Sequence, residues 1–213
     1  MSLVRPPGGG QEIWVPTTIG LIVGAVNTSG RVFWIGVMLG MAVLVIALPV
    51  AVRHRFEGVW IPSTSMAPTL LVGDYVLMDK AAHWRSRGDL VVFTDPGDTS
   101  ETLVKRIVGL AGEEIVVQGQ GVYVNCEPAD GCRPLAEPYA DFSDEVRTGR
   151  DVGPVQVPPG AVFVMADNRN AGEDSRHWGP VAQRLIIGRP MWIYWSSDAD
   201  GRTRWSRIGR RVR

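Results

Sequence analysis

Apolar and polar positions follow two patterns along this chain, one continuous and one interrupted. Residues 32–52 form the continuous pattern, an uncharged apolar run that Arg31 and Arg53 close on its two sides. The run has about the ~20 residues that a helix needs to cross a bilayer. A core helix usually has a polar face, which this run lacks, and the run is long for the apolar part of a cleaved signal sequence. The pattern therefore predicts a transmembrane anchor over residues 32–52.

A second apolar stretch, residues 13–26, lies in the N-terminal segment 1–31. It contains Pro16, Thr17 and Thr18 and is short for a membrane span, so the sequence leaves open whether one or two segments cross the membrane. Basic residues flank the main run on both sides. The positive-inside rule therefore sets no orientation, beyond a mild preference for a cytoplasmic C-terminal side.

Beyond Val59 the apolar pattern becomes interrupted. Short runs rich in β-branched residues alternate with Gly, Pro and Asp, and residues 56–213 show no sustained helical periodicity. Closely spaced strands with turn residues between them are typical of an all-β domain, here over residues 56–201. The runs that we expect to be strands are 75–78, 90–93, 103–108, 114–117, 122–124, 162–165, 186–187 and 191–195. Residues 136–159, rich in Pro, Gly, Asp and Glu, predict a long surface excursion between strands.

The charges balance overall but are unevenly distributed. Residues 61–201 hold 12 basic and 20 acidic side chains, whereas the tail 202–213 carries six Arg and no acidic residue. This basic tail could attract anionic lipid headgroups, at ~1 kcal/mol per charge near the surface. Trp205 is the only strong apolar residue there to insert, and we therefore favour a solvated, poorly ordered terminus.

Lysine is rare in this chain, which has twenty Arg but only Lys80 and Lys105. Arginine keeps its proton at any pH at which proteins are stable, whereas a buried lysine can lose its proton near neutral pH. Lys105 lies in an apolar, strand-like segment that would lower its pKa from ~10.4. Lys80 follows Asp79 and fits a water-facing side chain better. Lys105 is therefore the candidate base.

Two serines, Ser63 and Ser65, lie between Pro62 and Pro68. The prolines restrict the backbone, so this segment predicts an exposed, rigid loop that presents its side chains. A serine nucleophile needs a base within hydrogen-bonding reach and donors aimed at the developing oxyanion. Ser65 is the candidate nucleophile, with its own N–H and the Ser63 hydroxyl as the donors. Without a partner base the loop is a weak signal, since Ser and Pro are common in loops.

Cys126 and Cys132 bracket a turn-rich segment and are the two cysteines of the chain. A pair that closes a small loop fits a disulfide in an oxidising compartment better than a metal site, which usually needs four ligands. Two neighbouring reduced thiols are the alternative. The interpretation favours an extracytoplasmic domain without a metal centre.

Four segments together resemble the successive motifs of bacterial type I signal peptidases. In chain order they read IPSTSMAPTL at 61–70 followed by GD at 73–74, RGDLVVF at 87–93, VKRIVGL at 104–110, and DNR at 167–169 with DSRHWG at 174–179. The similarity extends over residues 61–195. Four motifs in order are far more specific than any one of them.

This resemblance implies a membrane-bound serine endopeptidase whose mainly β, antiparallel catalytic domain follows the transmembrane helix. By the same match Ser65 is the nucleophile, Lys105 is the general base, and Ser63 with the Ser65 N–H forms the oxyanion hole. Two ion pairs would brace the site: Arg106 with Asp167, and Asp174 with Arg176. Surface charges that contribute ~0 to 1 kcal/mol per pair are the alternative for these four residues.

The resemblance also implies the partners. The substrates would be secretory preproteins whose signal peptides end in small residues of the A-x-A type, at positions −3 and −1. An extended peptide would bind by adding a strand to an exposed sheet edge. We expect a monomer in the lipid bilayer of the cytoplasmic membrane, with the catalytic domain on the extracytoplasmic side. We expect no metal, no organic cofactor and no nucleic-acid partner.

Two residues depart from the family's pattern. Ala166 stands where many members have Gly before the Asp-Asn pair, and Gly172 stands where many have a serine that orients the lysine. Ser175 or a water is the candidate substitute for that hydroxyl, and we expect activity. The departures leave an alternative of another class, a catalytically weak or inactive membrane-anchored module that binds signal peptides or envelope proteins.

Other interpretations use some of the same residues differently. A Ser-His-Asp hydrolase would need His177, but this residue lies inside a matching motif. A self-cleaving repressor with Ser and Lys would need a DNA-binding domain where this chain has its apolar run. Trp60 and Met66, which lie between the anchor and the nucleophile, either form an apolar surface that enters the lipid or pack in the core.

Overall fold

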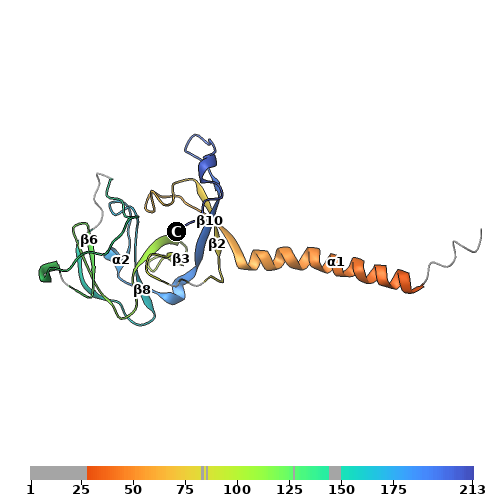
Figure 1. Ribbon diagram of the computed structural model, residues 1–213, viewed down its shortest axis with the longest axis horizontal. Helices are drawn as coiled ribbons and strands as arrows, with labels where there is room; N and C mark the ends of the chain where they lie inside the picture. The colour runs from red at the N-terminus through yellow and green to blue at the C-terminus, as the bar shows by residue number, and fades with distance from the viewer. Residues whose placement is uncertain (1–27, 83, 85, 127, 144–149) are drawn as a thin grey trace, which may run out of the picture. The chain divides into compact units, whose positions relative to one another are not determined.

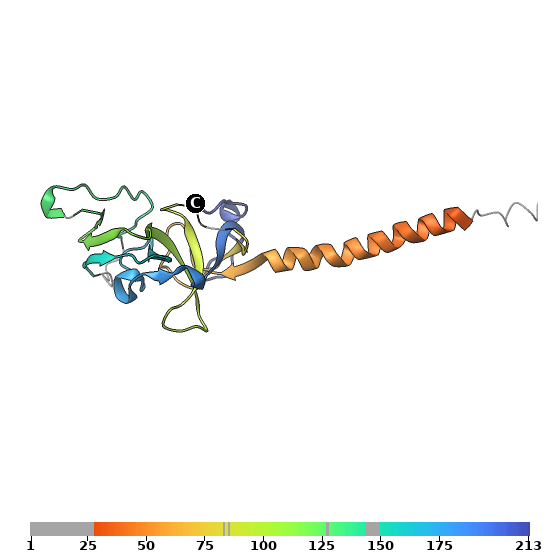
Figure 2. The same ribbon diagram turned by 90° about the horizontal axis from the view of Figure 1, so that it is seen from below.

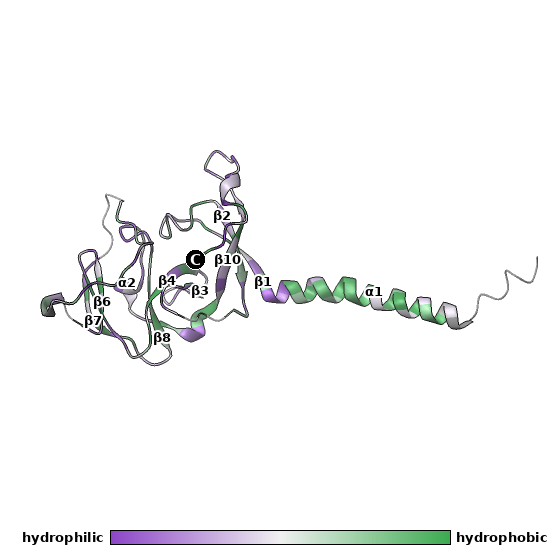
Figure 3. Cartoon of the chain, viewed as in Figure 1, coloured by the Kyte–Doolittle hydropathy of each residue, from purple (hydrophilic) through white to green (hydrophobic). Residues whose placement is uncertain are grey.

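The computed structural model describes residues 28–213 except 83, 85, 127 and 144–149, and the chain divides into two units, Met1–Val50 and Ala51–Arg213. The first unit holds most of helix α1, Thr28–Arg55, which extends beyond the predicted 32–52 at both ends. Hydrophobic residues cover most of its length (Figure 3). Within the described residues, α1 is the one helix long and apolar enough to cross a membrane, over Val32–Arg55. The apolar segment 13–26 lies outside the described residues.

The second unit is built on a seven-stranded sheet in which every strand pair is antiparallel (Figures 1 and 2). The strand order is β1-β2-β10-β3-β4-β8-β9. The strands are β1 Phe56–Trp60, β2 Asp74–Asp79, β3 Leu90–Thr94, β4 Thr102–Gly109, β8 Ala161–Met165, β9 Val181–Ala182 and β10 Ile186–Ser196. The expectation of a mainly β, antiparallel domain after an apolar helix is confirmed.

A three-stranded antiparallel sheet, in the order β6-β5-β7, completes the second unit. Its strands are β5 Glu114–Gln118, β6 Gly121–Val124 and β7 Val152–Gln156. Apolar side chains of this sheet pack against Phe163 and Met165 of β8 and form one core cluster with them. After β6 the structure joins Cys126 to Cys132, whose Cα atoms are 6.3 Å apart.

The strands differ from the sequence-based prediction in three places. Residues 186–187 and 191–195 belong to one strand, β10, whose register against β2 shifts twice, so that it does not keep a simple alternation of buried and exposed positions. The excursion 136–159 contains β7, although Gly153 and Pro154 interrupt its apolar pattern. Strand β1 follows α1 directly and was not predicted, because Glu57 and Gly58 break its apolar run.

The Ser65 segment is held by a core cluster beneath it. Ile61, Met66 and Leu70 are 4%, 2% and 0% exposed, and they pack with residues of β2, β3 and β10. Met66 therefore belongs to the core, while Trp60 keeps 54% of its surface exposed. The two side chains do not form one apolar surface, because only Trp60 is available to a membrane.

The basic tail 202–213 is part of the folded domain, and the expectation of a solvated, poorly ordered terminus is wrong. Val212 is buried in the same core cluster as Met66, and its N–H donates to the Met191 carbonyl over 2.8 Å. The Arg207 guanidinium is also buried and bonds both carboxylate oxygens of Asp74. The sequence does not reveal this, because a cluster of arginines is usually solvated. Burial of Arg207 could be predicted only from its contact with Asp74, which is distant in the sequence.

Candidate active site

Ser65 lies in the loop between β1 and β2, in a turn that two backbone hydrogen bonds define. The Ala67 N–H donates to the Thr64 carbonyl over 2.9 Å, and the Leu70 N–H donates to the Met66 carbonyl over 2.8 Å. Because Met66 and Leu70 are anchored in the core, the turn has a fixed place on the sheet. Ser65 is itself 7% exposed. The loop is thus better packed than the exposed loop that the sequence predicted.

Lys105 lies in β4, where it pairs with Val91 of β3, and it is 4% exposed. Its Nζ is 2.9 Å from Ser65 Oγ, within hydrogen-bonding distance. Burial lowers the pKa of the lysine, and this effect outweighs the opposing field of the Asp174 carboxylate. The two candidate groups therefore lie within hydrogen-bonding distance, and burial shifts the pKa of Lys105 toward the neutral amine.

Ser63 Oγ lies 3.1 Å from Ser65 Oγ, so that the two hydroxyls share a hydrogen bond. Both serines and Lys105 line two adjoining cavities, of about 60 Å³ and about 270 Å³. The smaller cavity is bounded by residues 59–63, 65–66 and 102–105, which are mostly apolar. The larger one adds three carboxylate residues: Asp95, Glu101 and Glu173. A bound carbonyl group could reach the Ser65 oxygen from these cavities.

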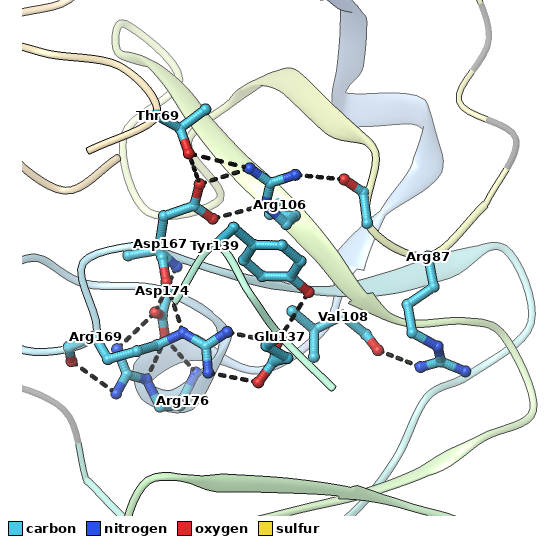
Figure 4. A network of polar contacts seen from close by, with 12 residues as sticks. Thr69, Arg87, Arg106, Val108, Glu137, Tyr139, Asp167, Arg169, Asp174 and Arg176 are labelled. Carbon is cyan, nitrogen blue, oxygen red and sulfur yellow. Dashed lines mark hydrogen bonds and ion pairs between the residues drawn. The ribbon is translucent and has the colours of Figure 1, made fainter. Parts of the chain in front are cut away.

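Arg106 follows Lys105 in β4, and successive side chains of a strand point to opposite faces. Figure 4 shows the contacts of Arg106 with Asp167 and Thr69. Its Nε and Nη2 bond the two carboxylate oxygens of Asp167 over 2.7 Å and 2.6 Å, and both side chains are at most 3% exposed. The Thr69 hydroxyl donates to the same carboxylate over 2.6 Å, and Arg106 Nη1 donates to the Gly88 carbonyl. The predicted pair is thus a buried bidentate contact that ties β4 to the Ser65 loop and to the residues after β8.

Asp174 is the N-cap of the short helix α2, Ser175–Trp178, and it also bonds Arg176 with both oxygens over 2.8 Å. Burial raises the pKa of this carboxyl. The hydrogen bond and the charge of Arg176 lower it by more, so the pKa lies below its usual value. Asp174 also accepts the Ala166 N–H over 2.9 Å, and Arg176 donates to the Arg169 carbonyl. The second predicted pair is therefore buried, and its hydrogen bonds to the backbone of residues 166 and 169 fix the conformation of the loop 166–174.

Three residues of the excursion 136–159 complete this network, and the sequence analysis missed them. The Glu137 carboxylate bonds the Arg169 guanidinium over 2.5 Å and 2.9 Å, with both side chains nearly buried (Figure 4). The Tyr139 ring lies 4.0 Å from the Arg106 guanidinium carbon, and its hydroxyl donates to Glu137. Asp141 exchanges backbone hydrogen bonds with residues 167 and 169. The one sequence feature that could have indicated these contacts is the presence of Glu137 and Tyr139 close together in a polar stretch.

The loop 166–174 contacts Ser65 through its backbone. The Asn168 N–H donates to the Ser65 carbonyl over 3.0 Å. Gly172 has a φ of +89°, and a Cβ placed on it would lie 3.0 Å from Ser65 Cβ and 3.8 Å from Lys105 Nζ. Any other residue there would be strained and would press on the dyad. The backbone at this position thus favours glycine, although the resemblance noted in the sequence implies a serine here.

The remaining candidates have structural places. Ala166 is fully buried and keeps a negative φ, so an alanine fits its backbone. The Ser175 hydroxyl accepts the Val164 N–H over 3.0 Å, which places it in the core of α2 and β8. The His177 Nδ1 accepts the Asp174 N–H over 3.3 Å and so completes the cap of α2. Among the described residues no group of three or more His, Cys, Asp or Glu is placed to hold a metal ion.

Comparison with known proteins gives consistent matches over this region. The profile of the family described as "Signal peptidase, peptidase S26" matches residues 32–195. The "Probable signal peptidase I-1" of Synechocystis sp. is 33% identical over 189 residues, covering 83% of this chain and 89% of that protein. The "Signal peptidase I" of Bacillus amyloliquefaciens is 33% identical over 168 residues, covering 73% and 83%.

A solved structure, that of a signal peptidase I from Enterococcus faecalis V583, aligns with a TM-score of 0.41 and 25% identity over 51% of this chain and 98% of that chain. This likeness is too low to carry an argument, and the assignment rests on the sequence matches. The profile covers more than half of the chain, and both relatives align over more than two thirds of their lengths. The chain therefore belongs to the signal peptidase family, peptidase S26, and is a peptidase.

Proposed function

We propose that this protein is a membrane-bound serine endopeptidase that removes N-terminal signal peptides from secretory preproteins with a Ser65–Lys105 dyad. The observation that carries the proposal is the 2.9 Å distance between Ser65 Oγ and Lys105 Nζ, with the lysine 4% exposed. A buried amine next to a hydroxyl, with its pKa lowered by burial, is the arrangement that base catalysis by lysine needs.

In the proposed reaction neutral Lys105 takes the proton of the Ser65 hydroxyl, while the oxygen attacks the scissile carbonyl carbon. The Ser63 hydroxyl and the Ser65 N–H stabilise the oxyanion that forms. Lys105 then gives the proton to the departing amine, and the amide bond breaks to leave an ester on Ser65. A water that has lost its proton to Lys105 hydrolyses this ester and restores the enzyme.

The proposed specificity is for small residues at positions −3 and −1 before the cut. The cavity of about 60 Å³ beside the dyad supports it, because a space of this size fits small side chains and little more. An extended peptide between the segments 59–66 and 102–105 would extend the sheet and place its carbonyl at Ser65. The relatives are named signal peptidases, and secretory signal peptides end in small residues of this kind.

Helix α1 supports the membrane part of the proposal. Its apolar length fits one span of a bilayer. We place the catalytic domain on the extracytoplasmic side, where secretory preproteins arrive and where the Cys126–Cys132 disulfide is stable. The domain acts as a monomer in this proposal, because both candidate catalytic groups come from one chain.

The test is cleavage of a preprotein with an A-x-A site by the purified full chain in detergent and in lipid, with the cut located by mass spectrometry. Ser65→Ala and Lys105→Ala should each abolish cleavage. Lys80→Ala is the matched control, since Lys80 is the other lysine and bonds Glu57 at the exposed surface of the domain. Cleavage that survives either dyad substitution would overturn the mechanism.

The second candidate function is an inactive module that binds signal peptides. The observation that favours it is Gly172, which brings no hydroxyl to orient Lys105. Peptide binding without cleavage by the wild type, in detergent and in lipid, would select this alternative.

A further inference from the structure

A cationic cavity lies in the catalytic unit, apart from the dyad. It measures about 520 Å³ and is lined by three arginines, Arg55, Arg189 and Arg211, with Asp79 as its one carboxylate among the described residues. Ligand pockets usually measure ~300 to 1,000 Å³. Its lining includes neither Ser65 nor Lys105. The proposed peptidase mechanism gives this cavity no task.

All three arginines are fixed to the sheet. The Arg55 carbonyl accepts the Lys80 N–H over 2.8 Å, and its guanidinium bonds Asp79. Arg189 lies opposite Asp79 in the β10–β2 ladder and pairs with Asp89 over 2.7 Å. Ion pairs therefore hold the guanidinium groups of Arg55 and Arg189 at the cavity before any ligand binds.

Arg211 differs from the other two because no carboxylate among the described residues bonds its guanidinium. Its neighbours Arg210 and Val212 pair with β10, through the Ile193 N–H to the Arg210 carbonyl and the Val212 N–H to the Met191 carbonyl. The guanidinium lies 5.8 Å from the ring centre of Trp192, which is 40% exposed. The cavity thus presents a positioned cation that is free to pair with an anion.

The place of Arg55 in the chain sets the depth of this cavity. The apolar run ends at Val52 and the first charge beyond it is Arg53. At ~1.5 Å per helical residue, Arg55 lies about 5 Å past the apolar run, and the headgroup layer is ~5 to 8 Å thick on each side of a bilayer. The exposed Trp192 is a residue typical of this layer. A cavity that Arg55 lines therefore opens at the level of lipid headgroups.

We propose that this cavity binds the phosphate of an anionic phospholipid headgroup, with Arg211 and Arg189 as forked donors and Arg55 beside them. Guanidinium groups bind phosphate oxygens bidentately. A zwitterionic headgroup carries the same phosphate but adds a cation that the three arginines repel. The depth of the site favours a lipid over a soluble phosphate, whose local concentration gains nothing from the membrane.

The experiment is native mass spectrometry of the full chain in detergent micelles with equal amounts of phosphatidylglycerol and phosphatidylcholine. The wild type should retain phosphatidylglycerol preferentially. Arg211→Gln should reduce this preference about fivefold, the factor that corresponds to one arginine–lipid charge contact. Arg211→Lys should lose part of it, because the charge remains and the fork is lost. Arg202→Gln is the matched control, since Arg202 is an exposed arginine outside the cavity and should leave the preference unchanged.

Three results would overturn the proposal. Equal retention of both lipids by the wild type, or an equal loss in the Arg202 and Arg211 variants, would show that no specific site exists. Inorganic phosphate that displaces phosphatidylglycerol at equal concentration would assign the cavity to a soluble anion. Thermal unfolding of each variant, which should match that of the wild type because Arg211 is exposed, keeps a folding defect separate from a binding defect.

Discussion

Lys105 has a pKa that several neighbours pull in opposite directions. Burial lowers it most, Asp174 raises it, Arg176 lowers it, and Asp167 and Asp95 raise it again. Asp174, Arg176 and Asp167 cannot be changed alone, because each is half of a buried ion pair. Asp95 lines the larger catalytic cavity and belongs to no ion pair among the described residues. It is therefore the one neighbour through which the lysine can be tuned without breaking the domain.

Asp95→Asn should shift the acid limb of the pH profile of kcat/KM to lower pH. Catalysis needs the neutral amine, so the rate falls as the pH drops through the pKa of Lys105. The Asp95 charge raises this pKa, and its removal extends activity into more acidic solution. Asp98→Asn is the control, because Asp98 lies in the same turn but bonds Ser100 outside the cavity. A limb that moves to higher pH would contradict the assignment of Lys105 as the base.

Gly172→Ala should reduce kcat strongly and also destabilise the protein. The positive φ costs any other residue about 1 to 2 kcal/mol, and the added Cβ would press on Ser65 from 3.0 Å. Gly112→Ala separates the two effects, because Gly112 has a similar φ of +85° but open space around its Cβ position. Denaturant unfolding should show a similar loss in both variants. Peptide cleavage should fall in the Gly172 variant alone, and equal activities would show that the contact with Ser65 is unimportant.

At the scale of elements, the excursion 136–159 and the loop 166–174 act as one clamp on the Ser65 turn. Glu137 and Asp141 of the excursion hydrogen-bond to the loop 166–174. Two residues of this loop in turn hydrogen-bond to the Ser65 turn: Asn168 binds the Ser65 carbonyl, and Asp167 accepts the Thr69 hydroxyl. These contacts join segments that are far apart in the chain. The position of the Ser65 turn therefore depends on a stretch whose sequence resembles an ordinary surface connection.

Glu137→Gln should lower the free energy of unfolding by about 3 kcal/mol, because it leaves the Arg169 guanidinium buried without its carboxylate. Tyr139→Phe is the matched change, since it keeps the ring over Arg106 and removes only the hydroxyl that donates to Glu137. We expect it to cost about 1 kcal/mol. Urea unfolding of both variants compares the two losses of unfolding free energy. A Glu137 variant as stable as the Tyr139 variant would mean that the ion pair of Glu137 with Arg169 is not buried in solution.

The sequence predicted the elements that have strong local signals. The apolar run gave α1, and eight β-branched runs all fall within strands of the structure. Strands β1 and β7 were missed because glycine, proline or glutamate interrupts them, and their partners lie elsewhere in the chain. The contact between Ser65 and Lys105 could be predicted because a single lysine in an apolar segment and a serine motif are local features. Glu137 and Tyr139 were not, since only the folded chain brings them to Arg169 and Arg106.

For the whole molecule, the pair of Asp74 with Arg207 joins the start of the sheet to the tail. Burial raises the pKa of Asp74, but hydrogen bonds from Arg207, the Leu71 N–H and Ser196 lower it more, so the net direction is downward. A carboxyl with a lowered folded-state pKa contributes stability above its unfolded pKa of ~3.9 and loses it as the pH falls through the folded value. The tail thus contributes to stability at neutral pH and less in acid.

Arg207→Met should destabilise the full chain by about 3 kcal/mol at pH 7, because the buried Asp74 charge loses its partner. The difference in the free energy of unfolding between variant and wild type should narrow below pH ~3.9. In this range the unfolded chain binds a proton at Asp74, so the wild type loses the stability that the ion pair contributes. Arg202→Met, a change at an exposed arginine of the same tail, should have little effect. Urea unfolding at several pH values tests this, and a difference that stays constant with pH would mean that Asp74 is not the group involved.

The contact between Asp74 and Arg207 spans 133 residues of sequence. A ribosome makes the Ser65 turn early and the segment that packs beneath it late, and domains fold as their parts emerge. Until β10 and the tail have been synthesised, Ile61 and Met66 lack two buried residues of their core cluster, Ile193 and Val212. Both Ser65 and Lys105 exist once residue 105 has been made, so for about the second half of synthesis a nascent chain carries both residues without the complete packing beneath the Ser65 turn. If the proposed function holds, this delay would keep an incomplete chain from cleaving peptides before its domain has folded.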